Sequence, residues 1–127
     1  MSRPNWTVPP ALDKETIKKM LRSTWDVMHK TAAWFDLVCQ LPQEQKQQLH
    51  GSQVRYQVDN LICGDCISHA QEYIRQNPPE DEIPSIWTWR FHNAVNRRLG
   101  KPEMNWDTYK DIYLVRKPKV CSASCGD

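Results

Sequence analysis

At 127 residues, the chain is long enough for one domain with a sizeable hydrophobic core. Its 17 Lys and Arg residues nearly balance its 15 Asp and Glu residues, and the resulting net charge of +2 gives no general reason to expect nucleic acid as a partner. No apolar run approaches the roughly 18 residues of a membrane-spanning helix, and the N-terminus is too polar for a signal peptide.

The first helix is predicted to follow a proline-rich arm at residues 1–12, which we expect to be flexible. Asp13 is a candidate N-cap for a long helix over about residues 14–40. Apolar residues recur in this segment at helical spacing. The core face predicted from them consists of Ile17, Met20, Leu21, Met28, Ala32, Phe35 and Val38.

The second and third helices are predicted on either side of residue 62. Pro42 ends the first segment and is expected to open a polar helix that runs to about residue 61, with Gly51 as a candidate break. The apolar positions of this helix are Leu49, Val54, Val58 and Leu61. A third helix is predicted over about residues 63–76, and a proline-rich, acidic loop follows at residues 77–84.

The last two helices complete the predicted fold. One covers about residues 85–99 and ends at Gly100, and the other begins at Asn105 as its N-cap. No segment shows the alternating pattern of a strand. The predicted fold class is therefore all-α, a compact bundle of four helices plus a short fifth one over residues 13–116. Residues 117–127 form a polar tail that we expect to be flexible.

The five cysteines suggest reversible thiol chemistry or metal binding more than structural disulfides. They lie at Cys39, Cys63, Cys66, Cys121 and Cys125, so four of them form two close pairs. A disulfide that closes so short a loop stabilises a fold little. The CGDC pair would be redox-active if it began a helix, because a helix N-terminus lowers the pKa of a thiol. The alternatives are an inert pair and a zinc site formed by Cys63, Cys66, Cys121 and Cys125, with His69 or His50 as substitute ligands.

A second group of candidate residues lies on the first predicted helix. Trp25 and His29 are four residues apart, so their rings share one face. Ala33 continues that line and Arg22 precedes it by about one turn. Two flat rings beside small residues could clamp a planar ligand. The alternative is a core tryptophan with a half-buried histidine.

A third group lies on the fourth predicted helix, where His92 and Asn96 are also four residues apart and Asn93 lies on a neighbouring strip. A buried Asn amide needs hydrogen-bond partners. A ligand rich in donors and acceptors would supply them, and exposure to solvent is the alternative. The apolar stripe of this helix consists of Trp87, Phe91, Val95 and Leu99.

In this order, the three groups resemble the Erv/ALR family of FAD-linked sulfhydryl oxidases, in the compact form found in large DNA viruses. The motifs are R-S-x-W-x-x-x-H-x-x-A-A-aromatic at 22–34, C-x-x-C at 63–66 and H-N-x-V-N-x-x-L-G-K-P at 92–102. The resemblance implies a homodimeric helical bundle that binds FAD and oxidises dithiols with O2, giving H2O2. Implied partners are dithiol protein substrates or a thioredoxin-like relay protein. A viral member would act in the host cytoplasm or virion, and the alternative location is the mitochondrial intermembrane space.

The resemblance also implies residue roles, and it implies no metal. Cys63 would exchange with substrate, while Cys66 would lie beside the flavin. The implied cofactor-binding residues are Arg22, Trp25, His29, Ala33, Cys66, His92, Asn93, Val95, Asn96, Leu99, Lys101 and Tyr113. Cys121 and Cys125 would form a shuttle disulfide, with a dispensable tail as the alternative.

Some positions depart from the family pattern or have no role in it. Trp89 and Trp106 stand about where cellular members have a structural disulfide, so we expect tryptophan packing to replace it. Cys39 is interpreted as a buried free thiol. His69 has no assigned role.

Overall fold

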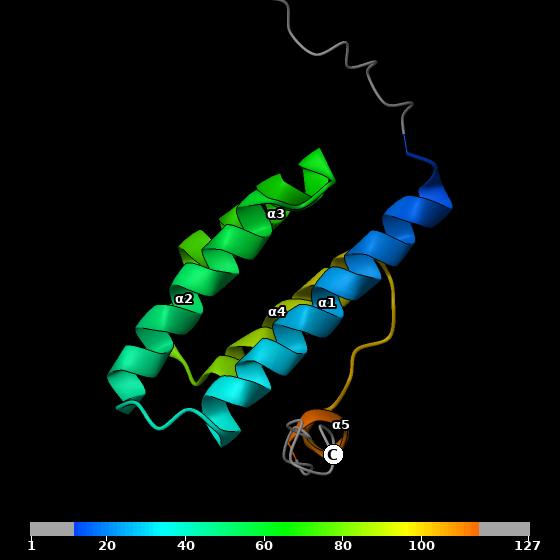
Figure 1. Cartoon of the computed structure of the whole chain (residues 1–127). Coiled ribbons are helices and arrows are strands. Elements are labelled where there is room, and N and C mark those ends of the chain that lie inside the picture. Colours follow the sequence, from blue (N-terminus) through cyan, green and yellow to red (C-terminus); the bar gives the residue numbers. More distant parts are fainter. Residues whose placement is uncertain (1–11, 115–127) are drawn as a thin grey trace, which may run out of the picture.

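The computed structural model describes residues 12–114, and within them every regular element is helical (Figure 1). The elements are α1 (Lys14–Leu37), α2 (Gln43–Asp59), α3 (Gly64–Gln76), a 3-10 turn η1 (Pro79–Asp81), α4 (Pro84–Arg98) and α5 (Trp106–Tyr113). The predicted all-α fold with a short fifth helix is confirmed. None of the helices in the described part of the chain is long and apolar enough to cross a membrane.

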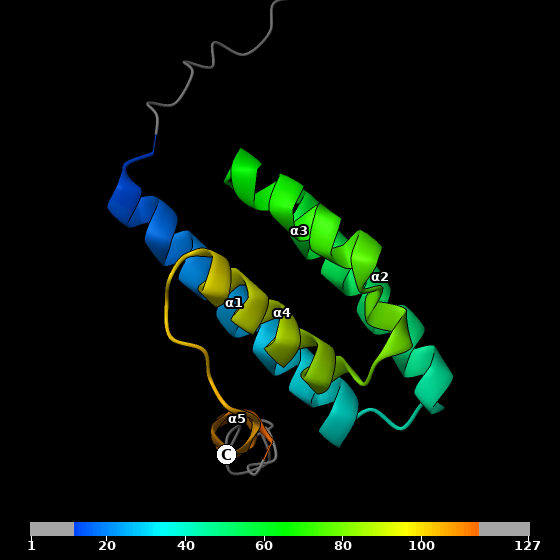
Figure 2. The same ribbon diagram turned by 180° about the vertical axis from the view of Figure 1, so that it is seen from behind.

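The four longer helices pack along their lengths, with α1 against α4 and α2 against α3 (Figure 2). The short helix α5 is seen end-on in both ribbon views and packs on α1. A loop leads to it from the end of α4. This loop and α5 therefore lie beside the α1–α4 pair, away from α3.

The core lies between α1, α2, α3 and α4. Each of these helices contributes buried side chains to one cluster: Met28, Val54, Val58, Ala70, Ile74, Trp87 and Phe91. Burial of one such large apolar side chain stabilises the fold by about 1.5–3 kcal/mol. Partly buried Trp25, Leu61, Tyr73 and Val95 pack against the cluster.

The helices α1, α3 and α5 each begin at a residue whose side chain caps the helix. The predicted N-cap Asp13 accepts a hydrogen bond from the backbone N–H of Thr16 (2.7 Å), and Asn105 caps α5 in the same way. The first helix ends at Leu37, three residues before the predicted end. Pro42 is the N-cap of α2 and so lies just before the helix, whereas we had predicted it to open the helix from within its first turn. The missing N–H and fixed φ of proline suit the boundary between two helices.

The predicted break at Gly51 is wrong, because α2 continues through it. Gly51 instead allows the η1 turn to approach α2 closely. The side chain of Glu80 in η1 lies so near that a Cβ at position 51 would collide with its carboxylate. Arg55 forms an ion pair with the same carboxylate, and Gln47 donates to the Glu80 carbonyl (2.6 Å). The glycine thus allows η1 to dock on α2.

Several residues predicted to face the core are substantially exposed: Met20, Val38, Leu49 and Leu99. The helical period was correct, but the apolar residues of α1 cover more than one face of the helix. A bundle of this size buries only part of that circumference. This leaves an apolar line on the surface of α1.

The N-terminus of α4 is held by α1. Pro84 occupies the first turn of α4, and the backbone N–H of Ser85 donates to the Asp36 carboxylate of α1 (2.7 Å). Burial raises the pKa of Asp36, while the hydrogen bond from Ser85 opposes that rise. The contact fixes α4 along α1, and this fixes the register of the histidines that face each other across the two helices.

Candidate functional site

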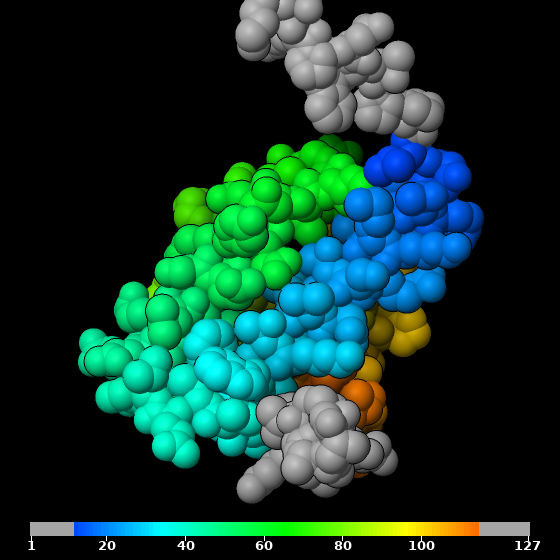
Figure 3. Space-filling model, in the orientation of Figure 1, coloured from blue at the N-terminus to red at the C-terminus, as the bar shows by residue number. Residues whose placement is uncertain are grey.

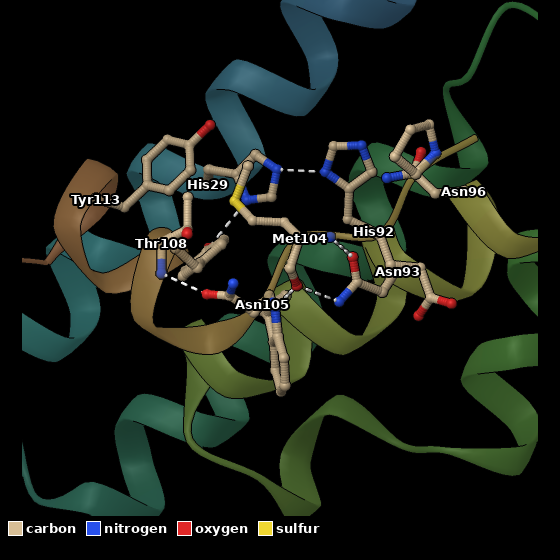
Figure 4. A pocket seen from close by; sticks show the side chains of 12 residues that line it. His29, His92, Asn93, Asn96, Met104, Asn105, Thr108 and Tyr113 are labelled. Atoms are coloured by element: carbon tan, nitrogen blue, oxygen red, sulfur yellow. Dashed lines mark hydrogen bonds between the residues drawn. The ribbon is translucent and has the colours of Figure 1, made fainter.

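A cavity of about 360 Å³ lies between α1, α4, α5 and the loop that joins the last two (Figure 4). Its lining residues are His29, Trp89, His92, Asn93, Asn96, Pro102, Glu103, Met104, Asn105, Thr108, Tyr109 and Tyr113. The volume is within the range of small-molecule sites, which is about 300–1,000 Å³. Five of the predicted cofactor-binding residues are brought together here: His29, His92, Asn93, Asn96 and Tyr113.

His29, His92 and Tyr113 of the pocket lining are stacked rings, with the centroids of His29 and Tyr113 4.6 Å apart. The predicted cofactor-binding residue Trp25 does not itself line the pocket and packs against the core. Its ring lies parallel to His92, with ring centroids 3.9 Å apart, and is also stacked with His29 at 5.8 Å. The prediction that Trp25 and His29 share one helical face is confirmed. Flat rings held in this way offer a surface for another flat ring.

The two histidines are linked by hydrogen bonds. His29 Nε2 and His92 Nδ1 are 2.8 Å apart, and His29 Nδ1 is 2.9 Å from the hydroxyl of Tyr109 (Figure 4). Burial lowers the pKa of His29 to about 3 and that of His92 to about 4, with a smaller contribution to His92 from the charge of Lys101. Both rings are therefore neutral at pH 7, so they act through stacking and hydrogen bonding.

The Asn93 side chain stabilises the loop between α4 and α5, because both polar atoms of its amide bond to the loop backbone. Its side chain donates to the carbonyl of Met104 (2.8 Å) and accepts from the N–H of the same residue (2.9 Å). The indole N–H of Trp89 donates to that carbonyl as well (2.7 Å). A ligand is therefore not needed to satisfy this amide, as the sequence argument had supposed, because backbone groups of the loop do so.

The Trp89 and Trp106 rings lie against each other, with centroids 5.2 Å apart, as predicted for tryptophan packing in place of a disulfide. Gly100 enables the loop to leave α4, because its φ of 70° is in the left-handed region. The backbone N–H of Lys101 then donates to the carbonyl of Asn96 (2.8 Å). Non-covalent contacts thus hold both ends of the pocket loop.

The pocket also presents polar groups that are open to a ligand. Within residues 12–114, the hydrogen bonds leave the Asn96 amide, the Tyr113 hydroxyl and Nε2 of His92 without a protein partner. Stacked rings beside free donors and acceptors suit the edge and face of a heteroaromatic ligand. The donor set of the pocket is therefore compatible with a planar heteroaromatic ligand.

The first cysteine pair lies at the start of α3. Cys63 is the N-cap, and its Sγ accepts from the backbone N–H of Cys66 (3.3 Å). Both are partly exposed free thiols. The predicted lowering of the thiol pKa by the helix N-terminus is wrong for Cys66 in this reduced state. Burial, together with the adjacent Cys63 thiol, raises the pKa of Cys66 to about 11, and the charge of Arg98 opposes the rise.

Other predicted site residues lie away from the pocket lining. Arg22, Leu99 and Lys101 are exposed at the surface. Ala33 is buried, and Val95 packs against the core. Cys66 is not among the lining residues either.

The structure describes some, but not all, of the remaining cysteines and candidate metal ligands. Cys39 is partly exposed, so the prediction that it is buried is wrong. His69 is exposed, whereas His50 is buried against Trp87. In the described segment, no group of three or more His, Cys, Asp or Glu residues is placed to hold a metal ion. Cys121 and Cys125 are outside the described residues.

Seven of the twelve lining residues were not predicted to bind the cofactor. These residues are Trp89, Pro102, Glu103, Met104, Asn105, Thr108 and Tyr109. The sequence did contain a signal for the loop between α4 and α5, because Gly100 and the N-cap Asn105 mark the two ends of a short connection in which the chain must reverse direction. Which side chains of this segment would point inward depends on the packing of α5 on α1, and no periodicity encodes that.

The family model described as Erv1 / Alr family matches residues 22–114 of the chain, which hold both the pocket and the thiol pair. The chain belongs to this family. Among its relatives is an FAD-linked sulfhydryl oxidase of African swine fever virus, 41% identical over 59 residues, which cover 44% of this chain and 50% of the relative. The mitochondrial FAD-linked sulfhydryl oxidase ERV1 of Saccharomyces cerevisiae is 29% identical over 100 residues, covering 74% of this chain and 50% of the relative.

The Erv1 / Alr fold is also found by comparison of structures. The crystal structure of the FAD binding domain of Erv1 from Saccharomyces cerevisiae superposes with a TM-score of 0.64 at 24% identity. The match covers 81% of this chain and 95% of that one. This likeness establishes the helical fold. The chain spans about half the length of the curated relatives named above.

Proposed function

We propose that this chain is an FAD-dependent sulfhydryl oxidase, a thiol oxidase that forms disulfide bonds in protein substrates. Electrons would pass from substrate dithiols through Cys63 and Cys66 to FAD and then to O2, giving H2O2. The observation that supports this most strongly is the pocket lined by His29 and His92, on which Trp25 stacks, with free polar groups beside them. The printed names of the viral and yeast relatives support the same activity.

The thiol pair would perform the exchange chemistry. A substrate thiolate attacks Sγ of Cys63 in the oxidised pair, so the Cys63–Cys66 bond breaks and Cys66 leaves as a thiolate. A second substrate thiolate then attacks the substrate sulfur of the mixed disulfide and displaces Cys63. The substrate has lost two electrons and two protons, and the pair has become a dithiol. Both sulfurs are partly exposed, and the choice of Cys63 as the attacked one follows the family resemblance.

The pocket would hold the cofactor through its purine end. Trp25, His29 and His92 would stack on or pair with the adenine ring. Asn96 and Tyr113 would contact ribose or ring-edge atoms, and Lys101 would offset phosphate charge. Bound FAD would supply the two-electron acceptor, and O2 would then reoxidise it.

A homodimer is the proposed assembly, and the surface of α1 supports it. Met20, Val27 and Trp34 of α1 recur every seven residues, and each is 44–46% exposed. Figure 3 shows α1 beside α2 on one open face of the molecule. A line of this period is typical of helix pairing, and a second copy offers the same line in a two-fold arrangement.

The dimer can be tested by one charge on that line. We expect Val27→Glu to convert a dimer to a monomer in sedimentation equilibrium, because the carboxylate would be desolvated against its own copy. Glu15→Gln, on the exposed first turn of the same helix, is the control. A wild-type chain that sediments as a monomer at high concentration would overturn the proposal.

Cys121 and Cys125 are proposed to relay electrons from a protein substrate, or a thioredoxin-like partner, to the first pair. Their position after a basic segment, with no run of apolar residues around them, supports a shuttle. Removal of the residues after Lys119 should slow oxidation of a reduced protein while leaving small dithiols unaffected. Equal rates on both substrates would rule out the shuttle.

The site of action proposed here is the cytoplasm of an infected cell or the virion, in keeping with the viral relative. The yeast relative is named mitochondrial, so the mitochondrial intermembrane space is the alternative. Fractionation of cells that express a tagged chain distinguishes the two.

The activity itself is tested on the purified protein. We expect a yellow protein whose visible absorption is bleached by dithiothreitol under nitrogen and restored by air, with oxygen uptake and peroxide in proportion to thiol lost. A colourless protein that unfolds with a chelator would indicate the alternative zinc-stabilised helical module.

A further inference from the structure

The hydroxyl of Tyr109 begins a chain of hydrogen bonds that leads from the interior to the pocket. Tyr109 is only 2% exposed, and its hydroxyl lies 2.9 Å from His29 Nδ1. The other nitrogen of His29 lies 2.8 Å from His92 Nδ1. His92 lines the pocket, and its Nε2 has no protein partner among residues 12–114. Three rings thus connect one buried proton to one open nitrogen.

Stacking holds these rings in place. His29 is stacked with both Tyr113 and Trp25, while His92 lies parallel to Trp25. Rotation of either imidazole would break a stack and a hydrogen bond together. The nitrogens that face each other are therefore fixed, and only the positions of the protons are left to be determined.

The buried hydroxyl decides between the two arrangements of protons. Among the described residues, His29 Nδ1 is the one acceptor within reach of the Tyr109 proton. If Tyr109 donates, His29 carries its proton on Nε2 and donates to His92 Nδ1, so His92 carries its proton on Nε2. In the reverse arrangement, the Tyr109 proton would be buried without an acceptor, which is unfavourable because the desolvation of the hydroxyl is not compensated.

The ionisation states are consistent with the first arrangement. Burial raises the pKa of Tyr109 above its usual range, so the hydroxyl keeps its proton. Burial also lowers the pKa of both histidines, so each ring carries a single proton at pH 7. The chain therefore holds one proton per ring.

We propose that Tyr109 is a positioning residue that sets the tautomers of His29 and His92, so that His92 presents an N–H donor to the pocket. The pocket would then select a heteroaromatic ligand with an acceptor atom on the ring edge, as a purine has. The ligand part of this inference rests on the proposed function, since it identifies the purine with the adenine of FAD. The tautomer part rests on the protein alone.

Tyr109→Phe removes the hydroxyl and keeps the ring that packs against His29 at 5.3 Å. His29 Nδ1 then loses its donor, and both proton arrangements leave one buried atom of His29 unpaired. We expect the two tautomers to become mixed. Tyr56→Phe, on the exposed surface of α2, is the matched control.

The first readout is the histidine ring spectrum of the purified protein labelled with ¹⁵N-histidine. Long-range proton–nitrogen correlations identify which nitrogen of each ring carries the proton. The wild-type chain and Tyr56→Phe should show both His29 and His92 protonated on Nε2, and Tyr109→Phe should show averaged shifts. A wild-type His29 protonated on Nδ1 would overturn the proposal even if Tyr109→Phe failed to fold, as would an unchanged spectrum in a folded Tyr109→Phe variant.

The second readout is affinity for FAD, with FMN as the matched probe that lacks adenine. Loss of one directed hydrogen bond should weaken FAD about 3- to 10-fold in Tyr109→Phe, and FMN should bind equally to both chains. Equal FAD affinity despite mixed tautomers would overturn the ligand part. A wild-type chain that binds no FAD would instead refute the proposed function and leave the tautomer result standing.

Discussion

The two functional ends of the molecule are built in different ways. At the pocket, residues from α1, α4 and α5 fix one another, so that His29 alone has two hydrogen bonds and stacks with both Trp25 and Tyr113. At the thiol end, Cys63 is placed by a local helix cap with Cys66. The comparison indicates that a ligand site needs tertiary preorganisation, whereas a thiol pair that exchanges with another protein needs a defined local geometry and access.

The largest effect should come from breaking the thiol end alone. Cys66→Ser should reduce dithiol-dependent oxygen uptake to background while leaving bound FAD and its spectrum unchanged, because Cys66 is not among the pocket residues. Oxygen uptake and the flavin content of the purified protein are the measurements. Cys39→Ser is the control, since Cys39 follows α1 and has no part in the exchange. Appreciable turnover in Cys66→Ser would show that the pair is not on the electron path.

The same contrast between local and tertiary contacts separates what could be predicted from the sequence from what could not. Features carried by neighbouring residues were predictable, such as the Asp13 cap and the shared face of Trp25 and His29. The bond between Tyr109 and His29 joins residues 80 positions apart, so no local pattern encodes it. The thiol end shows the limit of a local rule as well, since burial outweighed the expected effect of the helix N-terminus on Cys66.

The sequence motifs indicated the correct helices for the pocket, but the reason given for Asn93 was incomplete. Asn93 was expected to need a ligand, yet the backbone of Met104 satisfies its amide. The loop that does this could not be positioned from sequence, because its path depends on how Trp89 and Trp106 pack. The sequence therefore identified the pocket helices and missed the loop that completes the site.

A second, smaller effect should appear as acid sensitivity of the pocket and core. Burial lowers the pKa of His29 to about 3 and those of His50 and His92 to about 4, below the usual histidine value of 6.5. As the pH falls below 6.5, the unfolded chain binds protons that the folded chain does not, so the free energy of unfolding decreases. Each histidine contributes up to about 1.4 kcal/mol per pH unit, which gives about 5 kcal/mol for the three between pH 6.5 and 5.

Denaturant titrations at several pH values measure this slope. His50→Gln should remove about a third of it, because His29 and His92 of the pocket keep their lowered pKa values. His69→Gln, at an exposed position of the thiol-bearing helix α3, should leave the slope unchanged. A stability that is flat between pH 6.5 and 5 would contradict the burial of these three neutral rings.

The smallest of these effects should come from the tryptophan contact that holds the pocket loop. Trp89→Ala removes the hydrogen bond to Met104 and the ring contact with Trp106, so we expect a loss of about 2 kcal/mol in the free energy of unfolding. Trp89→Phe keeps a ring without the N–H and should lose about half as much. Guanidinium unfolding with FAD in excess in every sample measures both.

The same variants separate the two ends of the molecule. Because α3 packs on α2 and the loop packs on α4, loosening the loop should not alter the rate at which iodoacetamide modifies Cys63 and Cys66 in the reduced protein. Faster modification in Trp89→Ala would mean that the thiol end depends on the pocket loop, against the local origin inferred from the helix cap. Unchanged modification together with weaker FAD binding would establish that the pocket alone is preorganised by tertiary contacts.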